Sequence, residues 1–178
     1  MQILKTWRLA IVVGIVCLFC MISSARLRTY SQSFVTGAEK LALQQETIHN
    51  LYYISDQLDN VTTLYLSGSI TQETYEKHIG VLQKQYTVAK KKHDQMDKDY
   101  RVDAAELTYV ESQGIKSTDE SLRLMGVLLD SCEKHADNKD ELSYYYLAAG
   151  ESLSNAVAGY MAAVEIEDGN TEKSTQTQ

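Results

Sequence analysis

The sequence predicts an all-α protein, in which an N-terminal membrane or signal helix precedes an elongated antiparallel bundle of three long helices. Two observations support this fold class. The 178 residues include no proline, the residue that most strongly disrupts helices. Apolar and aromatic residues also recur at every third or fourth position through residues 71–110, which places them on one side of a helix. Such a long amphipathic helix needs neighbours to cover its apolar side, and this favours a bundle.

Residues 1–28 have the composition of a membrane anchor or an export signal. The basic residues Lys5 and Arg8 precede an apolar run at residues 9–22, which is followed by Ser23, Ser24 and Ala25. This order fits a signal peptide that is cleaved after Ala25. Residues 7–25 are also nearly long enough to cross a membrane once as a helix. We expect an uncleaved single-pass anchor in the cell membrane, with the bulk of the chain outside it, and the alternative is a secreted protein.

The turns of the expected bundle are marked by short-range signals. Gly68 follows Ser67 at the end of the first helix, and Thr71 is placed to cap the second. The second helix is expected to end at Gln113 and Gly114. Ser117 and Glu120 have the spacing of a capping box, which would start the third helix.

The third helix has two interpretations. Antiparallel folding about Gly114 would set the lysines at 90–92 level with the acidic residues Asp137, Asp140 and Glu141, and this match favours one continuous helix. Poor helix formers near Asn138 indicate the alternative, a break that gives four helices. In either case residues 29–168 form the bundle, and the polar residues 169–178 are expected to be a disordered tail.

The bundle segment is strongly acidic. The four charged residues of the first 28 are all basic, which leaves 13 basic and 24 acidic groups in residues 29–178, a net charge of −11. Such a surface repels phosphate backbones, so nucleic acid is not an expected partner.

The sequence shows no pattern that indicates catalysis, and we expect a non-enzymatic protein without a cofactor or a bound metal. A di-iron carboxylate bundle needs two Glu-x-x-His pairs, and Glu46 with His49 is the one such pair in the sequence. Cys17 and Cys20 have the spacing of a redox or zinc motif, but they lie inside the apolar run, where such sites do not occur.

Tyrosines are the candidates for contact with a protein partner or with a second copy of the chain. Tyr144 and Tyr145 belong to a run of three tyrosines that cannot all face inward on one helix. Tyr52 and Tyr53 are also neighbours in the sequence and are candidates for the same reason. Exposed tyrosines are enriched at interaction surfaces. The alternative is that these rings cover a wide seam of the bundle itself.

Four polar residues are candidates for a layer that sets the register between helices, and they are His93, Asp103, Lys91 and Asp140. His93 and Asp103 lie on the apolar side of the central helix, while Lys91 and Asp140 belong to the charge match described above. A buried histidine beside acidic groups can also titrate near neutral pH and act as a sensor.

These features predict a membrane-anchored helical bundle that acts as a protein–protein interaction, accessory or sensor-like module. In outline the chain resembles the ligand-binding bundles of bacterial receptors, in which an N-terminal membrane helix is followed by long helices. It shows neither their second apolar span nor their output domain. A secreted helical binding protein is the second interpretation, and a metal- or ligand-binding bundle is the third.

Overall fold

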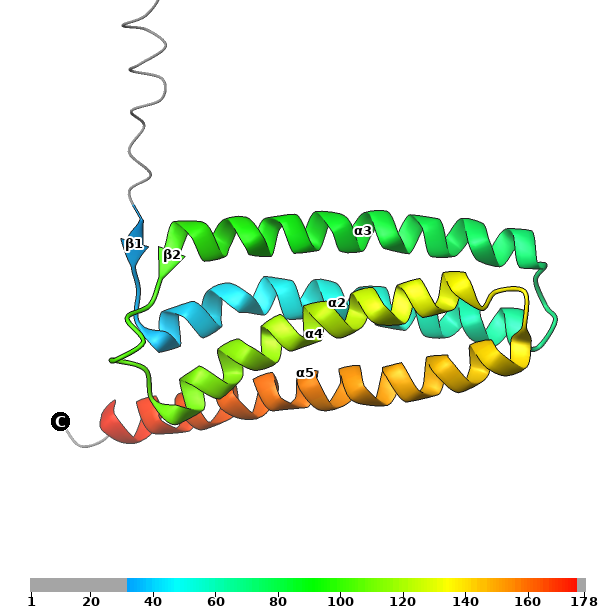
Figure 1. The fold of residues 1–178 in the computed structure, drawn as a ribbon. Coiled ribbons are helices and arrows are strands. Elements are labelled where there is room, and N and C mark those ends of the chain that lie inside the picture. The colour runs from blue at the N-terminus through cyan, green and yellow to red at the C-terminus, as the bar shows by residue number, and fades with distance from the viewer. Residues whose placement is uncertain (1–31, 176–178) are drawn as a thin grey trace, which may run out of the picture. The chain divides into compact units, whose positions relative to one another are not determined.

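The computed structural model describes residues 32–175, and in that range it confirms an all-α helical bundle (Figure 1). The expected membrane or signal segment lies outside the described residues. Within them, no helix combines the length and the apolar character that crossing a membrane requires. The elements are β1 (Ser33–Phe34), α2 (Gly37–Leu66), α3 (Gln72–Asp99), β2 (Tyr100–Arg101), α4 (Tyr109–Lys134) and α5 (Lys139–Thr175).

The four helices of the described range alternate in direction along the bundle (Figure 1). Helices α2 and α4 each pack against the other three helices, while α3 and α5 lie on opposite sides. The two short strands pair in parallel, with Ser33 opposite Tyr100 and Phe34 opposite Arg101. This pairing joins the start of the bundle to the end of α3.

The core is built from apolar side chains and from tyrosines whose hydroxyl groups donate to backbone carbonyls. Tyr160 donates to the carbonyl of Leu41 at 2.8 Å, and Tyr65 donates to that of Ala136 at 2.6 Å. These bonds satisfy the one polar group of each ring, so tyrosine can replace phenylalanine inside a thin bundle. The largest fully buried apolar side chains are Leu51, Ile54, Leu58, Ile79, Met125, Leu128, Leu129 and Leu142.

The predicted turn between the first two helices is confirmed. Helix α2 ends at Leu66, and Gly68 has a φ of 79°, a left-handed conformation that glycine adopts without a steric penalty. The hydroxyl group of Thr71 accepts a hydrogen bond from the backbone N–H of Thr74 and so caps α3.

The predicted end of the central helix at Gln113 and Gly114 is wrong. Helix α3 ends at Asp99, and the chain then runs through β2 and a loop before α4 starts at Tyr109. The cap of α4 is a complete capping box, in which the backbone N–H of Glu111 donates to Thr108 Oγ1 and the N–H of Thr108 donates to the Glu111 carboxylate. This box outweighs the helical spacing that continues through residues 100–110.

The two residues predicted to start the third helix therefore lie inside α4. Ser117 accepts a hydrogen bond from Ser121 through its carbonyl, and Glu120 binds Arg123 one turn along the same helix. Gly114 is a site of close packing: a Cβ atom there would lie 2.7 Å from Ala163 Cβ and 2.7 Å from Leu41 Cδ2. Glycine allows α4 to approach α2 and α5 at this level.

The favoured three-helix arrangement is wrong, and the four-helix alternative is correct. Helix α4 ends at Lys134 and α5 begins at Lys139. The side-chain oxygen of Asn138 accepts hydrogen bonds from the backbone N–H groups of Asp140 and Glu141, both at 3.2 Å, which is the cap that the alternative required. Helix α5 then continues to Thr175, so the predicted end of helical structure near Gly169 is also wrong.

The charge match that favoured a continuous third helix does not form. The ammonium group of Lys90 binds Asp94 on its own helix, and that of Lys92 binds Glu46 on α2. Both pairs are exposed to solvent, where such interactions contribute little to stability.

One buried polar side chain on α2 lacks a hydrogen-bond partner among the described residues. Gln44 is fully buried, and neither its amide nitrogen nor its amide oxygen is hydrogen bonded. A buried amide in this state costs free energy, because it has left water without compensation.

We expect Gln44→Leu to raise the free energy of unfolding by about 1 kcal/mol, measured by urea denaturation. The matched control is Gln45→Leu on the exposed side of α2, which should change stability by no more than about 0.5 kcal/mol. A loss of stability in Gln44→Leu would contradict this expectation.

Candidate functional site

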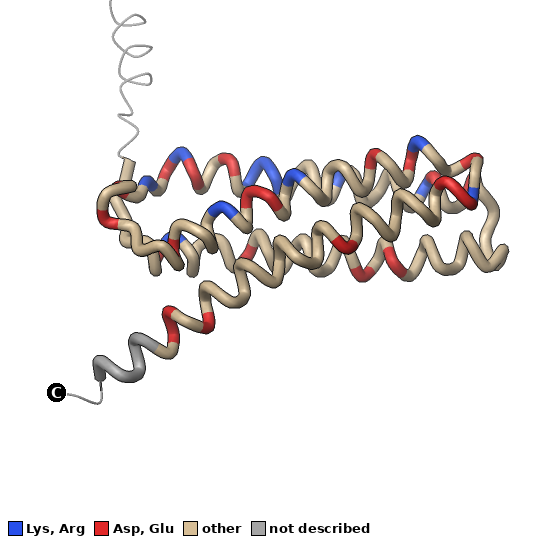
Figure 2. The backbone as a smooth tube through the Cα atoms, turned by 60° about the horizontal axis from the view of Figure 1, so that its bottom comes forward, with Lys and Arg blue, Asp and Glu red and all other residues tan. Residues whose placement is uncertain are grey.

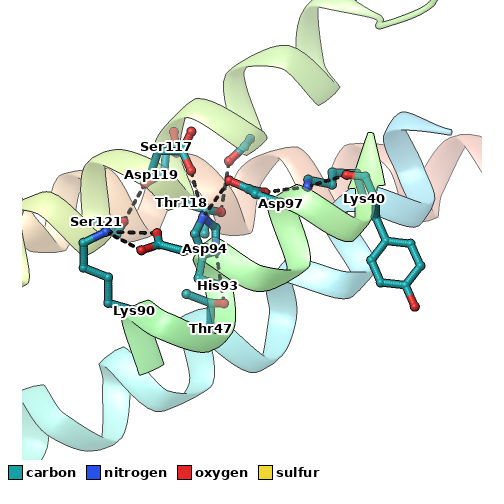
Figure 3. Close-up of polar contacts among 12 residues, drawn as sticks. Lys40, Thr47, Lys90, His93, Asp94, Asp97, Ser117, Thr118, Asp119 and Ser121 are labelled. Atoms are coloured by element: carbon teal, nitrogen blue, oxygen red, sulfur yellow. Dashed lines mark hydrogen bonds and ion pairs between the residues drawn. The ribbon is translucent and has the colours of Figure 1, made fainter. Parts of the chain in front are cut away.

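The most unusual polar feature of the bundle is a cluster of charged side chains that joins α2, α3 and α4 (Figure 3). His93 on α3 is its centre and is 3% exposed. The imidazole Nε2 lies 3.0 Å from Asp119 Oδ1 on α4 and 3.3 Å from Asp97 Oδ2 one turn along α3. The other ring nitrogen, Nδ1, lies 3.3 Å from Thr47 Oγ1 on α2. We name Lys40, Thr47, His93, Asp97 and Asp119 the His93 cluster.

Lys40 completes the cluster from α2. Its ammonium group is almost fully buried, binds Asp97 Oδ1, and donates a second hydrogen bond of 2.9 Å to the carbonyl of Tyr100. Tyr100 is the C-cap of α3, where unpaired carbonyls favour a positive charge. Lys40 therefore fastens α2 to the end of α3.

The protonation states in the cluster follow from this geometry. Burial lowers the pKa of His93, but hydrogen bonds and charge interactions with Asp119 and Asp97 outweigh it and raise the pKa to about 9. Burial likewise raises the pKa of Asp97, but the hydrogen bonds and charges of His93 and Lys40 outweigh it and lower the pKa to about 2. At neutral pH the imidazole is protonated, so two positive groups meet two carboxylates.

The ligand-type atoms of His93, Asp97 and Asp119 lie within 4.8 Å of one another, a spacing that could surround one cation. A metal ion would have to displace the proton on Nε2. It would also have to share Asp97 with the buried ammonium group of Lys40. We therefore interpret the His93 cluster as a network of ion pairs that holds three helices in register.

Of the four residues expected to set the register between helices, only His93 belongs to the buried cluster. His93 is buried at the centre of the cluster, as its position on the apolar side suggests. Asp103 lies exposed in the loop before α4, where its side chain accepts a hydrogen bond from the N–H of Ala105. Lys91 is exposed on α3, and Asp140 is exposed in the first turn of α5. These three residues therefore lie outside the His93 cluster.

Four members of the cluster were missed in the sequence, namely Lys40, Thr47, Asp97 and Asp119. A signal for Lys40 was present, because Lys40, Gln44 and Thr47 repeat at intervals of four and three residues beside the apolar Leu41. This spacing indicates a polar strip on the inward side of α2. The signal for the carboxylates was weak, since both are about half exposed and belong to helices with many acidic residues.

The four candidate tyrosines are exposed, but they do not form one patch. Tyr52 is 54% exposed and lies between α2 and α5, while the neighbouring Tyr53 is 55% exposed and lies between α2 and α3. Tyr145 stacks on His135 with ring centroids 4.3 Å apart, and Tyr144 meets Tyr145 edge to face at 5.3 Å.

A groove runs along the bundle between α2 and α5. Three adjoining hollows, with volumes of about 560, 100 and 620 Å³, share Tyr52 as a common wall. Together they extend over residues 42–59 of α2 and 146–164 of α5, and we name this surface the α2–α5 groove. Small residues such as Ser55, Gly150 and Ser154 contribute to its lining, while Tyr52 and Met161 expose apolar surface in it.

The charge along the groove has one sign. The charged residues that line it are Glu46, Asp56, Asp59 and Glu151. On α5, the charged residues from Asp140 to Asp168 are all acidic, and Figure 2 shows them in red along that helix. Most lysines and arginines of the described chain lie on α3 and α4 instead.

Comparisons of the chain with protein family models, with curated proteins and with solved structures find no match.

Proposed function

We propose that this chain is a non-enzymatic, membrane-anchored helical bundle that works through protein–protein contact, as an accessory or sensor-like module presented outside the membrane. The observation that carries the proposal is the α2–α5 groove, an open acidic channel with exposed aromatic and apolar side chains along one side of the bundle. Apolar surface of this kind, bordered by polar groups, is typical of interaction sites.

The distribution of polar contacts supports this role. The His93 cluster holds α2, α3 and α4 to one another on one side of the bundle. Helices α2 and α5 are joined by hydrogen bonds from Tyr160 to the carbonyl of Leu41 and from Tyr146 to Asp59, and small side chains in the lining of the groove leave it open along its length. A rigid scaffold that presents an open groove suits a binding role, because little conformational entropy is lost when a partner binds.

The membrane anchor is inferred from the composition of residues 7–25. The basic residues before the apolar run and the arginines after it, Arg26 and Arg28, are typical of the flanks of a single membrane helix. The alternative is a secreted protein. Sequencing the N-terminus of the mature protein decides between them: a start at Met1 or Gln2 supports the anchor, whereas a start at Arg26 eliminates it.

The interaction role is tested by placing a photo-crosslinking amino acid at single positions of the full chain in its native cells. We expect at least one discrete protein adduct from positions 52, 53, 144 and 145, because their side chains are exposed. Position 76 on the exposed side of α3 is the matched control and should give none. Irradiation that yields no adduct at any of the four tyrosine positions would contradict the interaction role.

A further inference from the structure

We propose that the occupant of the α2–α5 groove is a basic amphipathic helix of a partner protein, and this inference rests on the interaction role proposed above. Residues 42–59 of α2 and 146–164 of α5 give the groove a length of about 25 Å at 1.5 Å per residue. A helix of about 17 residues would fill that length.

The shape of the groove favours a helix over other structures. Its two walls are helices that run in opposite directions, and the channel between them is where a further helix of a bundle packs. Recognition of this kind uses apolar anchors spaced three or four residues apart on the incoming helix. Tyr52 and Met161 are half exposed on the walls and are the surfaces that such anchors would cover.

The acidic residues that line the groove indicate that its occupant is basic. Glu46, Asp56, Asp59 and Glu151 line the channel, and no lysine or arginine of the described chain does. Glu46 is paired with Lys92, and Asp59 accepts a hydrogen bond from Tyr146, so Asp56 on α2 and Glu151 on α5 are the main acidic groups offered to an occupant. Lysines or arginines beside the apolar anchors would therefore find carboxylates on both walls. The same acidic residues disfavour binding of a second copy of this chain, because contact between the two groove surfaces would bring like charges together.

Gly150 allows the groove to be filled without disturbing the fold. It lines the groove from α5, and a Cβ atom added there meets no atom within 4 Å. Gly80 is its matched control, since it lies inside α3, away from the groove, and a Cβ atom there also meets nothing within 4 Å. Both Gly150→Trp and Gly80→Trp replace a residue that is unfavourable in helices, so both variants should fold.

The test measures binding of three labelled synthetic 18-residue peptides to the full chain in nonionic detergent, by fluorescence anisotropy. The first peptide has leucine at every third or fourth position and lysine elsewhere, the second has the same composition in scrambled order, and the third has glutamate in place of lysine. The micelles are the same for every protein variant, so differences between variants report on the protein.

We expect the first peptide to bind at least tenfold more tightly than the other two. Gly150→Trp should weaken binding of the first peptide at least tenfold, while Gly80→Trp should leave its affinity unchanged. Equal binding of the scrambled peptide, tighter binding of the acidic peptide, or no effect of Gly150→Trp overturns the proposal. So does a dimer of the chain, measured by analytical ultracentrifugation, that Gly150→Trp dissociates, because the occupant would then be a second copy.

A second pair of variants tests the charge without filling the groove. Asp56→Lys combined with Glu151→Lys should weaken binding of the basic peptide at least tenfold. The control pair, Glu76→Lys with Glu106→Lys, makes the same change in net charge at exposed positions outside the groove and should have a smaller effect on binding. Equal effects of the two pairs would show attraction to the overall charge alone and would overturn the proposal. Crosslinks at Tyr144 or Tyr145 alone would preserve the interaction role while excluding this groove.

Discussion

Replacing Gly114 by leucine is expected to lower the free energy of unfolding by about 3 kcal/mol, because the packing around this residue has no room for a side chain. A Cβ atom alone would lie 2.7 Å from side-chain atoms of both Ala163 and Leu41. To accept four additional carbon atoms, α4 would have to move away from both α2 and α5. The gain in helix propensity, about 0.8 kcal/mol for replacing glycine, offsets only part of this cost.

The matched control is Gly80→Leu in α3, where the space beyond the Cβ position is open. This variant should be unchanged or slightly more stable, since only the gain in helix propensity applies. Urea denaturation of the two variants and the parent chain measures the difference. If the two substitutions had equal effects on stability, the close approach of α4 at Gly114 would not exist in solution.

The stability of the bundle is expected to fall as the pH rises from about 6.5 to about 9. The pKa of His93 is raised to about 9 in the folded chain, and an unfolded histidine has a pKa near 6.5. The folded state therefore holds the proton more tightly, and the stabilisation is fully present below pH 6.5 and is lost as the pH passes 9. The loss should be on the order of 2 kcal/mol, because solvent reaches the two partner carboxylates and weakens their interaction with the imidazolium.

His93→Leu supplies the comparison for this pH profile. The variant lacks the titrating group, so its free energy of unfolding should change less than that of the parent between pH 6 and pH 9. Denaturant unfolding at several pH values measures both profiles, and subtracting them removes the contribution of exposed lysines. Parallel profiles would contradict the raised pKa of His93 and would also end the hypothesis that this histidine acts as a sensor.

A weaker pH effect is expected at the acid end. The pKa of Asp97 is lowered to about 2, below its usual value, by His93 and Lys40. Its contribution is present above about pH 4 and is lost as the pH falls through 2. Asp97→Asn should reduce this acid sensitivity, and an unchanged acid profile would show that the carboxylate is not ion paired in solution.

The features that the sequence predicted correctly are those that local patterns determine. The all-α class followed from helical spacing and the lack of proline, and the turn at Gly68 and Thr71 followed from residues adjacent in the chain. The inward direction of His93 followed from its place on the apolar side of α3. Each of these inferences needs only the residues of one helix or one turn.

The errors arose where two local signals competed or where the partner is distant in the chain. At residues 100–108, helical spacing competed with the capping box of Thr108 and Glu111, and the box prevailed because its two reciprocal hydrogen bonds start a new helix. Asn138 likewise prevailed over a charge match between exposed groups. The bond of Lys40 to Asp97 spans 57 residues, and no local pattern specifies such a contact.

Cys132 gives the bundle an internal reporter of its own opening. It is the one cysteine among the described residues and is fully buried, and burial raises its thiol pKa to about 11. Near neutral pH the thiol is therefore both inaccessible and almost entirely protonated, which suppresses alkylation. Modification at this position requires α4 to separate from its neighbours, so the labelling rate of the peptide containing Cys132 measures how often the bundle core opens.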